Sequence, residues 1–323
     1  MRPSILAAIF LGVIFNQLQA AEYDYTFSNS ENTLRIEVWN HDLVHAEYGL
    51  SSSLFSGPIR LSPMVANTKR AKNLSIQASS NRITTESLDL TIDQSSLCLK
   101  VFDRIKNLSL TTLCPGSLKS WQKSLNFDAS QFENAYGLGE NFRNLGNADG
   151  DWVSLGGRNS LEYGNGFQLF QEAAVGNIQI PILYAIGDQI SFGFFLDNIY
   201  KQDWGFSTKR WYLETRGDQI RFFLIAGRDL KELRSKYLGL TGRPPVLPKK
   251  SLGLWMSKFG YHSWKEIDDT KQQMRNRGIP FDGFVLDINW FGSIDLRQPQ
   301  RSRMGFLEWD QSNSDGNDNY FPD

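Results

Sequence analysis

The chain has 323 residues, of which 41% are hydrophobic and 21% are charged. This composition supports one large or two smaller hydrophobic cores and excludes a largely disordered chain. The 34 Lys and Arg residues and 35 Asp and Glu residues leave a formal charge of -1, without the basic excess that binds nucleic-acid phosphates. With 2 Cys and 3 His, the chain cannot supply the four ligands of the usual structural zinc site. We therefore expect no nucleic-acid partner and no metal site.

Residues 1–20 have the layout of a secretory signal peptide. Arg2 precedes an apolar run at residues 5–15, and small residues follow at Ala20 and Ala21. The run is shorter than the ~20 residues that a helix needs to span a bilayer. A buried N-terminal helix is the alternative. We expect cleavage after Ala20 or Ala21, a secreted or periplasmic mature protein, and no membrane association after cleavage.

Cys98 and Cys114 suit an oxidising compartment and lie in a predicted β-hairpin. Residues 96–102 and 108–114 are predicted strands on either side of a turn-prone segment. A hairpin centred on Lys106 places the two cysteines opposite each other, where Cβ atoms are about 4.5–5.5 Å apart and close to disulfide reach. We expect a disulfide between them, and two free buried thiols are the alternative.

From about residue 22 to residue 226, apolar and polar residues alternate with the period of half-buried strands. The clearest alternating segments are residues 34–38, 88–92, 179–186, 190–196, 210–215 and 219–225. Gly, Asn and Asp separate these segments. Many short strands bounded by turn signals predict an antiparallel β-sandwich.

The pattern becomes helical after residue 226. Apolar residues at helical spacing predict a helix over residues 228–240, and Gly242 ends it. The proline-rich residues 243–248 cannot form a helix or a central strand, which indicates an interdomain linker. We therefore expect a sheet domain over residues 21–245 and a second domain over residues 246–323.

The second domain begins with the pattern of strand, helix, strand. Apolar runs predict strands at residues 252–256 and 283–288, and few apolar positions at helical spacing predict an outer helix over residues 263–277. Short connections between such elements are typical of a right-handed parallel βαβ unit. A (β/α)8 barrel begins in this way.

Five groups of residues carry a resemblance to a known family. In chain order they are residues 136–140 (YGLGE), 242–244 (GRP), 252–261 (LGLWMSKFGY), 282–288 (DGFVLDI), and 307–310 (LEWD) with 321–323 (FPD). In this order and at these spacings, the chain resembles the retaining α-glucosidases of glycoside hydrolase family 31 from about residue 22 to its C-terminus. The resemblance implies an N-terminal antiparallel β-sandwich, galactose-mutarotase-like, followed by the first strands of a truncated (β/α)8 TIM barrel.

Asp287 is the main candidate for binding substrate. It closes an apolar strand, so we expect it at the C-terminal mouth of the barrel, where barrel enzymes have their active sites. The resemblance implies that its carboxylate holds the sugar in the cleaved subsite, and a loop-bracing carboxylate is the alternative. Ile288 is expected to line the same pocket or to be plain core. Asp282 begins the strand and belongs to the opposite face, while Asn289 replaces a second acidic residue of the family and suggests a different subsite preference.

Several aromatic residues follow or lie within the predicted barrel strands. Phe259 and Tyr261 can offer flat apolar faces to a pyranose ring, and the resemblance favours Phe259 because a pocket aromatic occupies its place. Trp290 is expected to wall the pocket beside Asp287. Core packing is the alternative for each of these residues, and it is the expectation for Trp255 inside the first strand.

The segment 141–167 is a long loop rich in Gly and Asn. Loops of this length without secondary structure are uncommon unless they are functional. In family 31 a loop of the sandwich domain reaches over the barrel mouth, which makes Asn159 a candidate substrate contact. Arg158-Asn159 stands where the family often has Arg-Asp, and a solvated loop is the alternative.

No catalytic residue is assigned within these residues. Retaining glycosidases need two carboxyl groups about 5–5.5 Å apart. The resemblance implies that both are Asp residues on later barrel strands, beyond Asp323. Since a whole barrel takes about 250 residues, we expect residues 246–323 to be an incomplete barrel, and the chain alone to be inactive.

The resemblance implies an enzyme that hydrolyses O-glycosyl bonds of α-glucosides or α-glucans with net retention and without a cofactor. Two alternatives stay open. One is a non-catalytic carbohydrate-binding β-sandwich, and the other is a family 31 member with transglucosylase or α-xylosidase specificity. The sequence contains no G-x-S-x-G, G-x-x-x-x-G-K-[ST] or G-x-G-x-x-G motif that would indicate a different chemistry.

Overall fold

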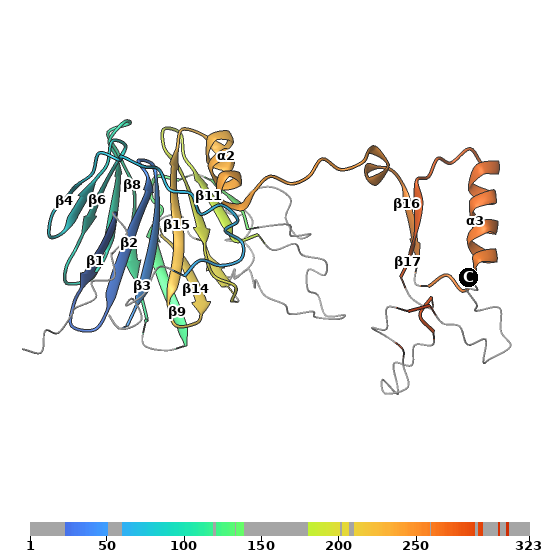
Figure 1. The fold of residues 1–323 in the computed structure, drawn as a ribbon, viewed down its shortest axis with the longest axis horizontal. Helices are drawn as coiled ribbons and strands as arrows, with labels where there is room; N and C mark the ends of the chain where they lie inside the picture. Colours follow the sequence, from blue (N-terminus) through green and yellow to red (C-terminus); the bar gives the residue numbers. More distant parts are fainter. Residues whose placement is uncertain are drawn as a thin grey trace, which may run out of the picture. The chain divides into compact units, whose positions relative to one another are not determined.

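A computed structural model of the chain describes residues 23–50, 60–118, 121–132, 134–138, 180–200, 202–206, 210–258, 260–287, 290–292, 303 and 308–309. The chain divides into two compact units, one ending at Arg243 and the other beginning at Pro244. This division falls inside the proline-rich segment 243–248. Figure 1 shows mostly strands in the first unit, and strands beside a longer helix in the second.

Two sheets form the first unit, which we call the sheet unit. Sheet A has the order β1-β2-β3-β15-β12-β11-β10, with β1 (Asp24–Ser28), β2 (Thr33–Asn40), β3 (Leu43–Gly49), β15 (Ile220–Gly227), β12 (Ser191–Leu196), β11 (Ile182–Ile186) and β10 (Asn134–Gly137). Sheet B has the order β13-β14-β9-β8-β7-β6-β5-β4, with β13 (Gln202–Gly205), β14 (Arg210–Arg216), β9 (Gln122–Asp128), β8 (Leu108–Pro115), β7 (Leu99–Asp103), β6 (Leu88–Ile92), β5 (Arg82–Thr84) and β4 (Gln77–Ala78). The described strand pairs of both sheets are antiparallel. The mostly-sheet architecture predicted from the alternation is confirmed.

Aromatic side chains from both sheets meet in one core. The ring centroid of Phe194 in sheet A lies 4.6 Å from that of Phe222 in the same sheet. It also lies 4.8 Å from Phe127 and 5.7 Å from Trp204, both of which belong to sheet B. All four side chains are buried. Offset and edge-to-face aromatic contacts of this kind add stability beyond the buried area.

The outer faces of the two sheets differ. Strand β14 alternates between buried and exposed residues, as the sequence pattern predicts for a strand with one solvated face. Strand β2 is buried on both faces, including Arg35 and Glu37, which the alternation had marked as its polar side. Glu37 accepts a hydrogen bond from Arg70 at 2.6 Å and Arg35 pairs with Asp24. Buried charges are tolerated when they are paired in this way.

Helix α2 and the segment before β4 cover the outer face of sheet A. Leu233 and Leu240 of α2 (Leu230–Thr241) pack with Val65 and with apolar residues of β11, β12 and β15. The helix begins after the N-cap Asp229, whose side chain accepts from the backbone of the first turn, and it ends at Gly242 with φ of 88°. The predicted helix and its stop are confirmed, with the first helical residue two positions later than expected.

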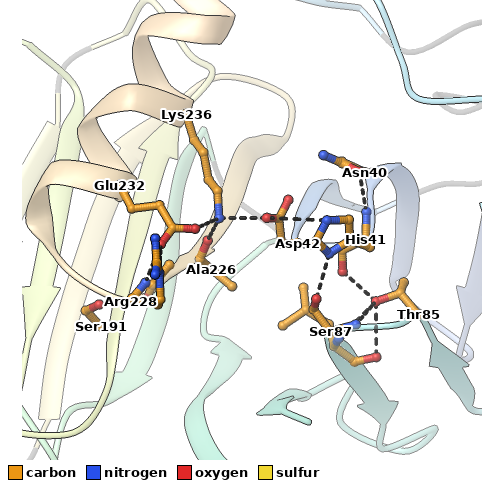
Figure 2. A network of polar contacts seen from close by, with 12 residues as sticks. Asn40, His41, Asp42, Thr85, Ser87, Ser191, Ala226, Arg228, Glu232 and Lys236 are labelled. Atoms are coloured by element: carbon orange, nitrogen blue, oxygen red, sulfur yellow. Dashed lines mark hydrogen bonds and ion pairs between the residues drawn. The ribbon is translucent and has the colours of Figure 1, made fainter. Parts of the chain in front are cut away.

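A polar network holds α2 against sheet A (Figure 2). Lys236 Nζ lies 2.6 Å from Asp42 Oδ2, in the turn between β2 and β3, and 2.7 Å from Glu232 Oε1. It also donates to the backbone oxygen of Ala226 at 2.6 Å. Arg228 and Lys236 lower the pKa of Glu232 to about 2, so this carboxylate stays charged.

The same turn connects to sheet B (Figure 2). A 2.6 Å hydrogen bond joins His41 Nδ1 and Ser87 Oγ, and Thr85 Oγ1 donates to the backbone oxygen of His41. Thr85 and Ser87 belong to the turn between β5 and β6. The last helix before the linker is therefore connected, through polar contacts, to both sheets.

The cysteines lie side by side in the hairpin of β7 and β8. Leu99 pairs with Leu113, which puts Cys98 opposite Cys114, and their sulfur atoms form a disulfide with Cα atoms 4.2 Å apart. The register shifts at a β-bulge, in which Leu110 of β8 lies between the partners of Val101 and Phe102, a feature that the sequence did not indicate. The bulge lies on the turn side of the pairing between Leu99 and Leu113, so it leaves the cysteines opposed.

The second unit, which we call the βαβ unit, contains β16 (Trp255–Lys258), α3 (Trp264–Asn276) and β17 (Gly283–Leu286). The two strands are parallel, with Trp255 paired to Gly283 and Lys258 paired to Leu286. The predicted order of strand, helix and parallel strand is present. The predicted start of the first strand is wrong, because residues Lys249–Leu252 form a 3-10 helix whose Ser251 N–H bonds to the Pro248 oxygen.

Helix α3 has the N-terminus that its sequence predicts. The Ser263 side chain caps it by accepting from the backbone N–H of Glu266 at 3.2 Å. Ile267 and Met274 are its buried residues, in keeping with an outer helix that has a narrow apolar face.

The predicted signal peptide lies outside the described residues. In the part of the chain that the structure describes, every helix is too short or too polar to cross a membrane.

Candidate functional site

The C-terminal ends of β16 and β17 lie at one edge of the small parallel sheet. Lys258 and Leu286, the last residues of the two strands, are paired, and Asp287 follows directly. The Asp287 side chain is exposed, and it has no hydrogen bond or ion pair with any other described residue. Its carboxylate is therefore placed to accept hydrogen bonds from a bound ligand, at the strand end where barrel enzymes bind substrate.

An aromatic cluster lies beside this edge. Tyr261 is 2% exposed and packs with Ile267, Phe284, Leu286 and Trp290. Burial raises the pKa of the Tyr261 hydroxyl. The structure therefore places Tyr261 in a packed cluster, the arrangement that the sequence left as an alternative to sugar contact.

Trp290 contacts both the cluster around Tyr261 and a second tryptophan, Trp309. It packs partly buried against the Tyr261 cluster, and its ring centroid lies 5.3 Å from that of Trp309. Trp309 in turn lies 5.7 Å from Trp264 at the start of α3. Trp290 thus follows Asp287 closely and belongs to a row of indole rings, which gives the strand-end edge an aromatic border.

Charged groups fix the connection between β16 and α3. Lys258 Nζ forms an ion pair with Glu266 Oε1 and lies 5.0 Å from the centre of the Tyr261 ring. Glu266 Oε2 accepts from the backbone N–H of His262 at 2.8 Å. The hydrogen bond from His262 and the ion pair with Lys258 lower the pKa of Glu266. One carboxylate thus ties the end of β16 to the start of α3.

Sequence reasoning did not single out Lys258 or Glu266. The signal for Glu266 was available, because Ser263 and Glu266 have the S-x-x-E spacing of a capping box. The signal for Lys258 was a lone cation at the end of an otherwise uncharged strand. Their pairing could not be predicted, since it depends on the path of the connection between them.

The other end of β17 has a structural role. The Asp282 N–H donates to the Leu254 oxygen at 2.8 Å. A Cβ on Gly253 would lie 1.7 Å from Asp282 Oδ2, so a larger residue there would require the Asp282 side chain to move. The Trp255 ring lies against Gly283, with its Nε1 donating to the Lys250 oxygen at 2.9 Å. Trp255 remains 42% exposed and is not enclosed by described residues.

The motif at residues 136–140 begins at the end of edge strand β10. Gly137 has φ of 105°, and a Cβ there would lie 2.2 Å from the Ile182 oxygen, so the backbone requires glycine. Leu138 is buried and its N–H bonds to the same oxygen at 2.7 Å. The motif therefore fixes the point at which the chain leaves sheet A toward the segment 141–167.

Some predicted site residues are not described by the structure. Phe259, Ile288, Asn289 and Asn159 lie outside the described residues, as does the loop 141–167. Among the described residues, no group of three or more His, Cys, Asp or Glu side chains is arranged to hold a metal ion.

Known proteins match both units. Residues 244–321 match the family model described as Glycosyl hydrolases family 31 TIM-barrel domain. The chain is 29% identical over 130 residues to alpha-glucosidase 2 of Bacillus thermoamyloliquefaciens, a match that covers 40% of this chain and 16% of the relative. It is 28% identical over 178 residues to an alpha-xylosidase of Saccharolobus solfataricus, covering 54% of this chain and 23% of the relative. The chain thus spans less than a quarter of the length of these relatives.

A solved structure shares the fold. The family 31 dextranase of Flavobacterium johnsoniae, in complex with isomaltotriose, superposes with a TM-score of 0.63 at 21% identity. The superposition covers 83% of this chain and 33% of the dextranase. The family model covers the βαβ unit, the two relatives are named as an alpha-glucosidase and an alpha-xylosidase, and the solved structure is described as a family 31 dextranase. The chain therefore resembles proteins of glycoside hydrolase family 31, most specifically over residues 244–321.

Proposed function

We propose that this chain is part of a retaining α-glycosidase that acts on α-glucosides or α-glucans. In this proposal the sheet unit is the galactose-mutarotase-like sandwich, and the βαβ unit opens the (β/α)8 barrel. The two reacting carboxyl groups, which a retaining mechanism holds about 5–5.5 Å apart, come from later barrel strands of the whole protein. No cofactor takes part.

The observation that carries this proposal is the position of Asp287. Its exposed carboxylate follows β17 directly, at the end shared with β16, inside the segment that matches the family 31 barrel. A carboxylate that accepts hydrogen bonds from two sugar hydroxyls fixes the position of the ring relative to the reacting groups. Asp287 is then a binding residue of the cleaved subsite.

The neighbouring groups support this role by holding the strand-end edge rigid. The pair of Lys258 and Glu266 ties β16 to α3, and the cluster around Tyr261 packs under the same edge. A pre-organised edge costs less ordering free energy when substrate binds. Trp290 supplies an apolar ring beside the carboxylate, and we propose that Phe259, Ile288 and Asn159 complete the pocket.

A second specificity remains a candidate. The Saccharolobus relative is named an alpha-xylosidase and matches a larger share of this chain than the Bacillus alpha-glucosidase does. Asn289, in place of the family's second acidic residue, also suggests an altered subsite. An α-xylosidase or a transglucosylase would use the same Asp287 contact and differ in which sugar it accepts.

The test uses the complete protein that carries these residues, and it compares the two carboxylates that flank β17. We expect Asp287→Asn to lower kcat/KM on an aryl α-glucoside by about 10²-fold or more, because a charge-assisted hydrogen bond to the substrate is lost. Asp282→Asn, at the opposite end of β17, is the matched control and is expected to stay within about twofold. An unchanged rate for Asp287→Asn would contradict the assigned role.

Parallel assays on aryl α-glucoside and aryl α-xyloside decide the specificity. A higher kcat/KM on the xyloside would replace the glucosidase proposal by the second candidate. The 323 residues alone are expected to show no turnover, and hydrolysis by this chain would overturn the placement of the reacting groups. Both assays use the same purified protein, so differences in folding do not affect the ratio.

We also propose export through residues 1–20, to a secreted or periplasmic location. The layout of Arg2, the apolar run and the small residues supports this, and the disulfide of Cys98 and Cys114 suits an oxidising compartment. N-terminal sequencing of the exported protein is expected to begin at residue 21 or 22. A mature protein that retains Met1 would contradict cleavage.

A further inference from the structure

Two aromatic side chains lie exposed in contact with each other on the sheet unit. Trp121 is 56% exposed and Tyr200 is 41% exposed, and their ring centroids are 5.4 Å apart with the planes at 72°. Ile199, next to Tyr200, is 71% exposed. The other described tryptophans of this unit, Trp39, Trp204 and Trp211, are buried. An exposed cluster of large apolar side chains commonly marks a binding surface.

The backbone around these two rings is held in place. The Gly217 N–H, in the turn between β14 and β15, donates to the Trp121 oxygen at 3.1 Å. Gly217 has φ of 113°, and a Cβ there would lie 2.6 Å from Tyr200 Cε2, so the Tyr200 ring lies directly against this glycine. The buried Asn198 accepts from the Tyr200 N–H at 2.8 Å and donates to the Arg216 oxygen at 3.2 Å.

Three separate connections of the sheet unit therefore build this surface. Trp121 precedes β9, Tyr200 follows β12, and Gly217 lies between β14 and β15. Because these segments are bonded to one another, a ligand that stacks on the rings need not order them first. Pre-organisation of this kind reduces the free-energy cost of binding.

Polar residues neighbour the two rings along the chain and across the strands. Gln122 follows Trp121, pairs with Arg216 across β9 and β14, and donates to Glu214 Oε2 at 2.6 Å. Asp218 is exposed in the turn that contains Gly217. The segments that carry the two rings thus also carry amide, guanidinium and carboxylate groups.

This combination matches a carbohydrate better than a membrane or a protein. A pyranose ring presents C–H groups on its faces and hydroxyls around its edge, which fit an aromatic ring bordered by hydrogen-bonding groups. A membrane surface is approached by broad apolar faces with basic residues, and a stable protein interface buries about 800 Å² on each partner. Three exposed apolar side chains offer far less area than that.

We propose that Trp121 and Tyr200 form a carbohydrate-binding surface that holds a glucan chain outside the catalytic pocket. The choice of an α-glucan as ligand rests on the proposed glycosidase function. Binding a long substrate at a second place raises its effective concentration at the pocket. The surface therefore matters for polymers and not for a small aryl glycoside.

The first experiment measures retardation of the 323-residue chain in native gels that contain dextran or soluble starch. Trp121→Ala and Tyr200→Ala are each expected to weaken binding by about tenfold or more, as for aromatic residues at the centre of an interface. Tyr212→Ala, which removes a tyrosine exposed on β14 of the same sheet, is the matched control and should bind normally. Trp121→Phe keeps an aromatic ring and is expected to restore most of the binding.

The unfolding midpoint of each variant separates lost binding from lost folding. Normal retardation of Trp121→Ala would overturn the proposal, and so would a wild-type chain that is not retarded by either polymer. Weaker binding by a folded Trp121→Ala, with normal binding by Tyr212→Ala, supports it.

The second experiment uses the complete protein and compares two substrates. Trp121→Ala is expected to raise KM for the polymer by about tenfold and to leave kcat/KM for the aryl glycoside unchanged. Equal loss on both substrates would overturn a binding surface that is separate from the pocket. Absence of activity in the wild type would instead contradict the proposed function, while the retardation result would stand by itself.

Discussion

In the sheet unit, Phe194 and Trp204 are fully enclosed between two sheets. In the βαβ unit, by contrast, Leu252 is 78% exposed, and Trp255 and Val285 also keep much of their surface in contact with solvent. The described part of this unit has two parallel strands and one helix, which are too few to cover both faces of a parallel sheet. The sheet unit thus holds an enclosed core, whereas the described part of the βαβ unit leaves large apolar side chains exposed. This difference agrees with the proposed sandwich and the proposed opening of a barrel.

The largest effect should come from truncating one phenylalanine in each unit. Phe194→Ala removes a ring that contacts both sheets, and we expect a loss of about 3–5 kcal/mol in the free energy of unfolding of the sheet unit. Phe284→Ala, in β17, is expected to leave that transition within about 0.5 kcal/mol. Urea titration monitored by tryptophan fluorescence measures the unfolding free energy of the sheet unit in both variants. Equal losses would mean that the two units unfold together, which would contradict a separate core in the sheet unit.

Removal of the disulfide tests how much this covalent bond adds to the stability of the sheet unit. Cys98 and Cys114 are 16 residues apart, and a loop of that length corresponds to about 3 kcal/mol of stabilisation in the chain-entropy account. The double variant Cys98→Ser/Cys114→Ser is expected to lower the stability of the sheet unit by this amount. Dithiothreitol should destabilise the wild type and not the double variant, and an effect on both would identify a cause other than the disulfide.

The acid stability of the sheet unit depends on a buried pair. His45 Nε2 lies 3.1 Å from Asp197 Oδ2, and the Ser62 N–H donates to the other oxygen at 2.9 Å. Burial opposes the charge of Asp197, yet the hydrogen bonds from His45 and Ser62 outweigh it and the pKa of Asp197 is lowered. A lowered pKa stabilises the fold above the unfolded value of about 3.9 and loses that contribution as the pH falls through the folded value.

Asp197→Asn is therefore expected to cost about 2 kcal/mol at pH 7 and to flatten the loss of stability below pH ~4. Urea midpoints measured from pH 3 to pH 7 give both quantities. Asp188→Asn, at an exposed position, is the control and should keep the wild-type profile. A wild-type acid profile in Asp197→Asn would assign the pH dependence to other groups.

The smallest effect should come from the ion pair of the βαβ unit. Lys258 and Glu266 are partly exposed, and such pairs contribute about 0.2–1 kcal/mol. Lys258→Met is expected to leave global stability nearly unchanged and to speed protease cleavage between β16 and α3. Glu266→Gln should act the same way, and the effect should shrink at high salt because exposed charges are screened. Unchanged cleavage would show that packing around Tyr261 suffices to hold the connection.

Local signals predicted several elements well because their causes lie close together in the chain. Helical spacing placed α3 within residues 263–277, Gly242 ends α2, and the hairpin symmetry of Cys98 and Cys114 brings the cysteines together. Caps, stops and hairpins depend on residues within a few positions of one another, so sequence alone determines them. The position of Asp287 at the end of a strand was predictable for the same reason.

Only the tertiary structure decided which polar strand residues are buried. The alternation in β2 places Arg35 and Glu37 on one face of a strand, but it does not tell whether another element covers that face. Leu233 of α2, far along the chain, belongs to the cover, and Arg70 supplies the partner charge for Glu37. The sequence therefore determined the periodicity, and long-range packing determined the burial.

The same distinction applies to the two candidate binding surfaces. Asp287 is carried by a single short motif, and the family resemblance pointed to it without the fold. Trp121 and Tyr200 are separated by several strands, and they meet only because the connections to β9 and β12 are brought together beside Gly217. Sequence alone determined the elements and the family, because these depend on neighbouring residues. The exposed aromatic pair required the folded sheets, because contacts between distant segments depend on how the whole chain packs.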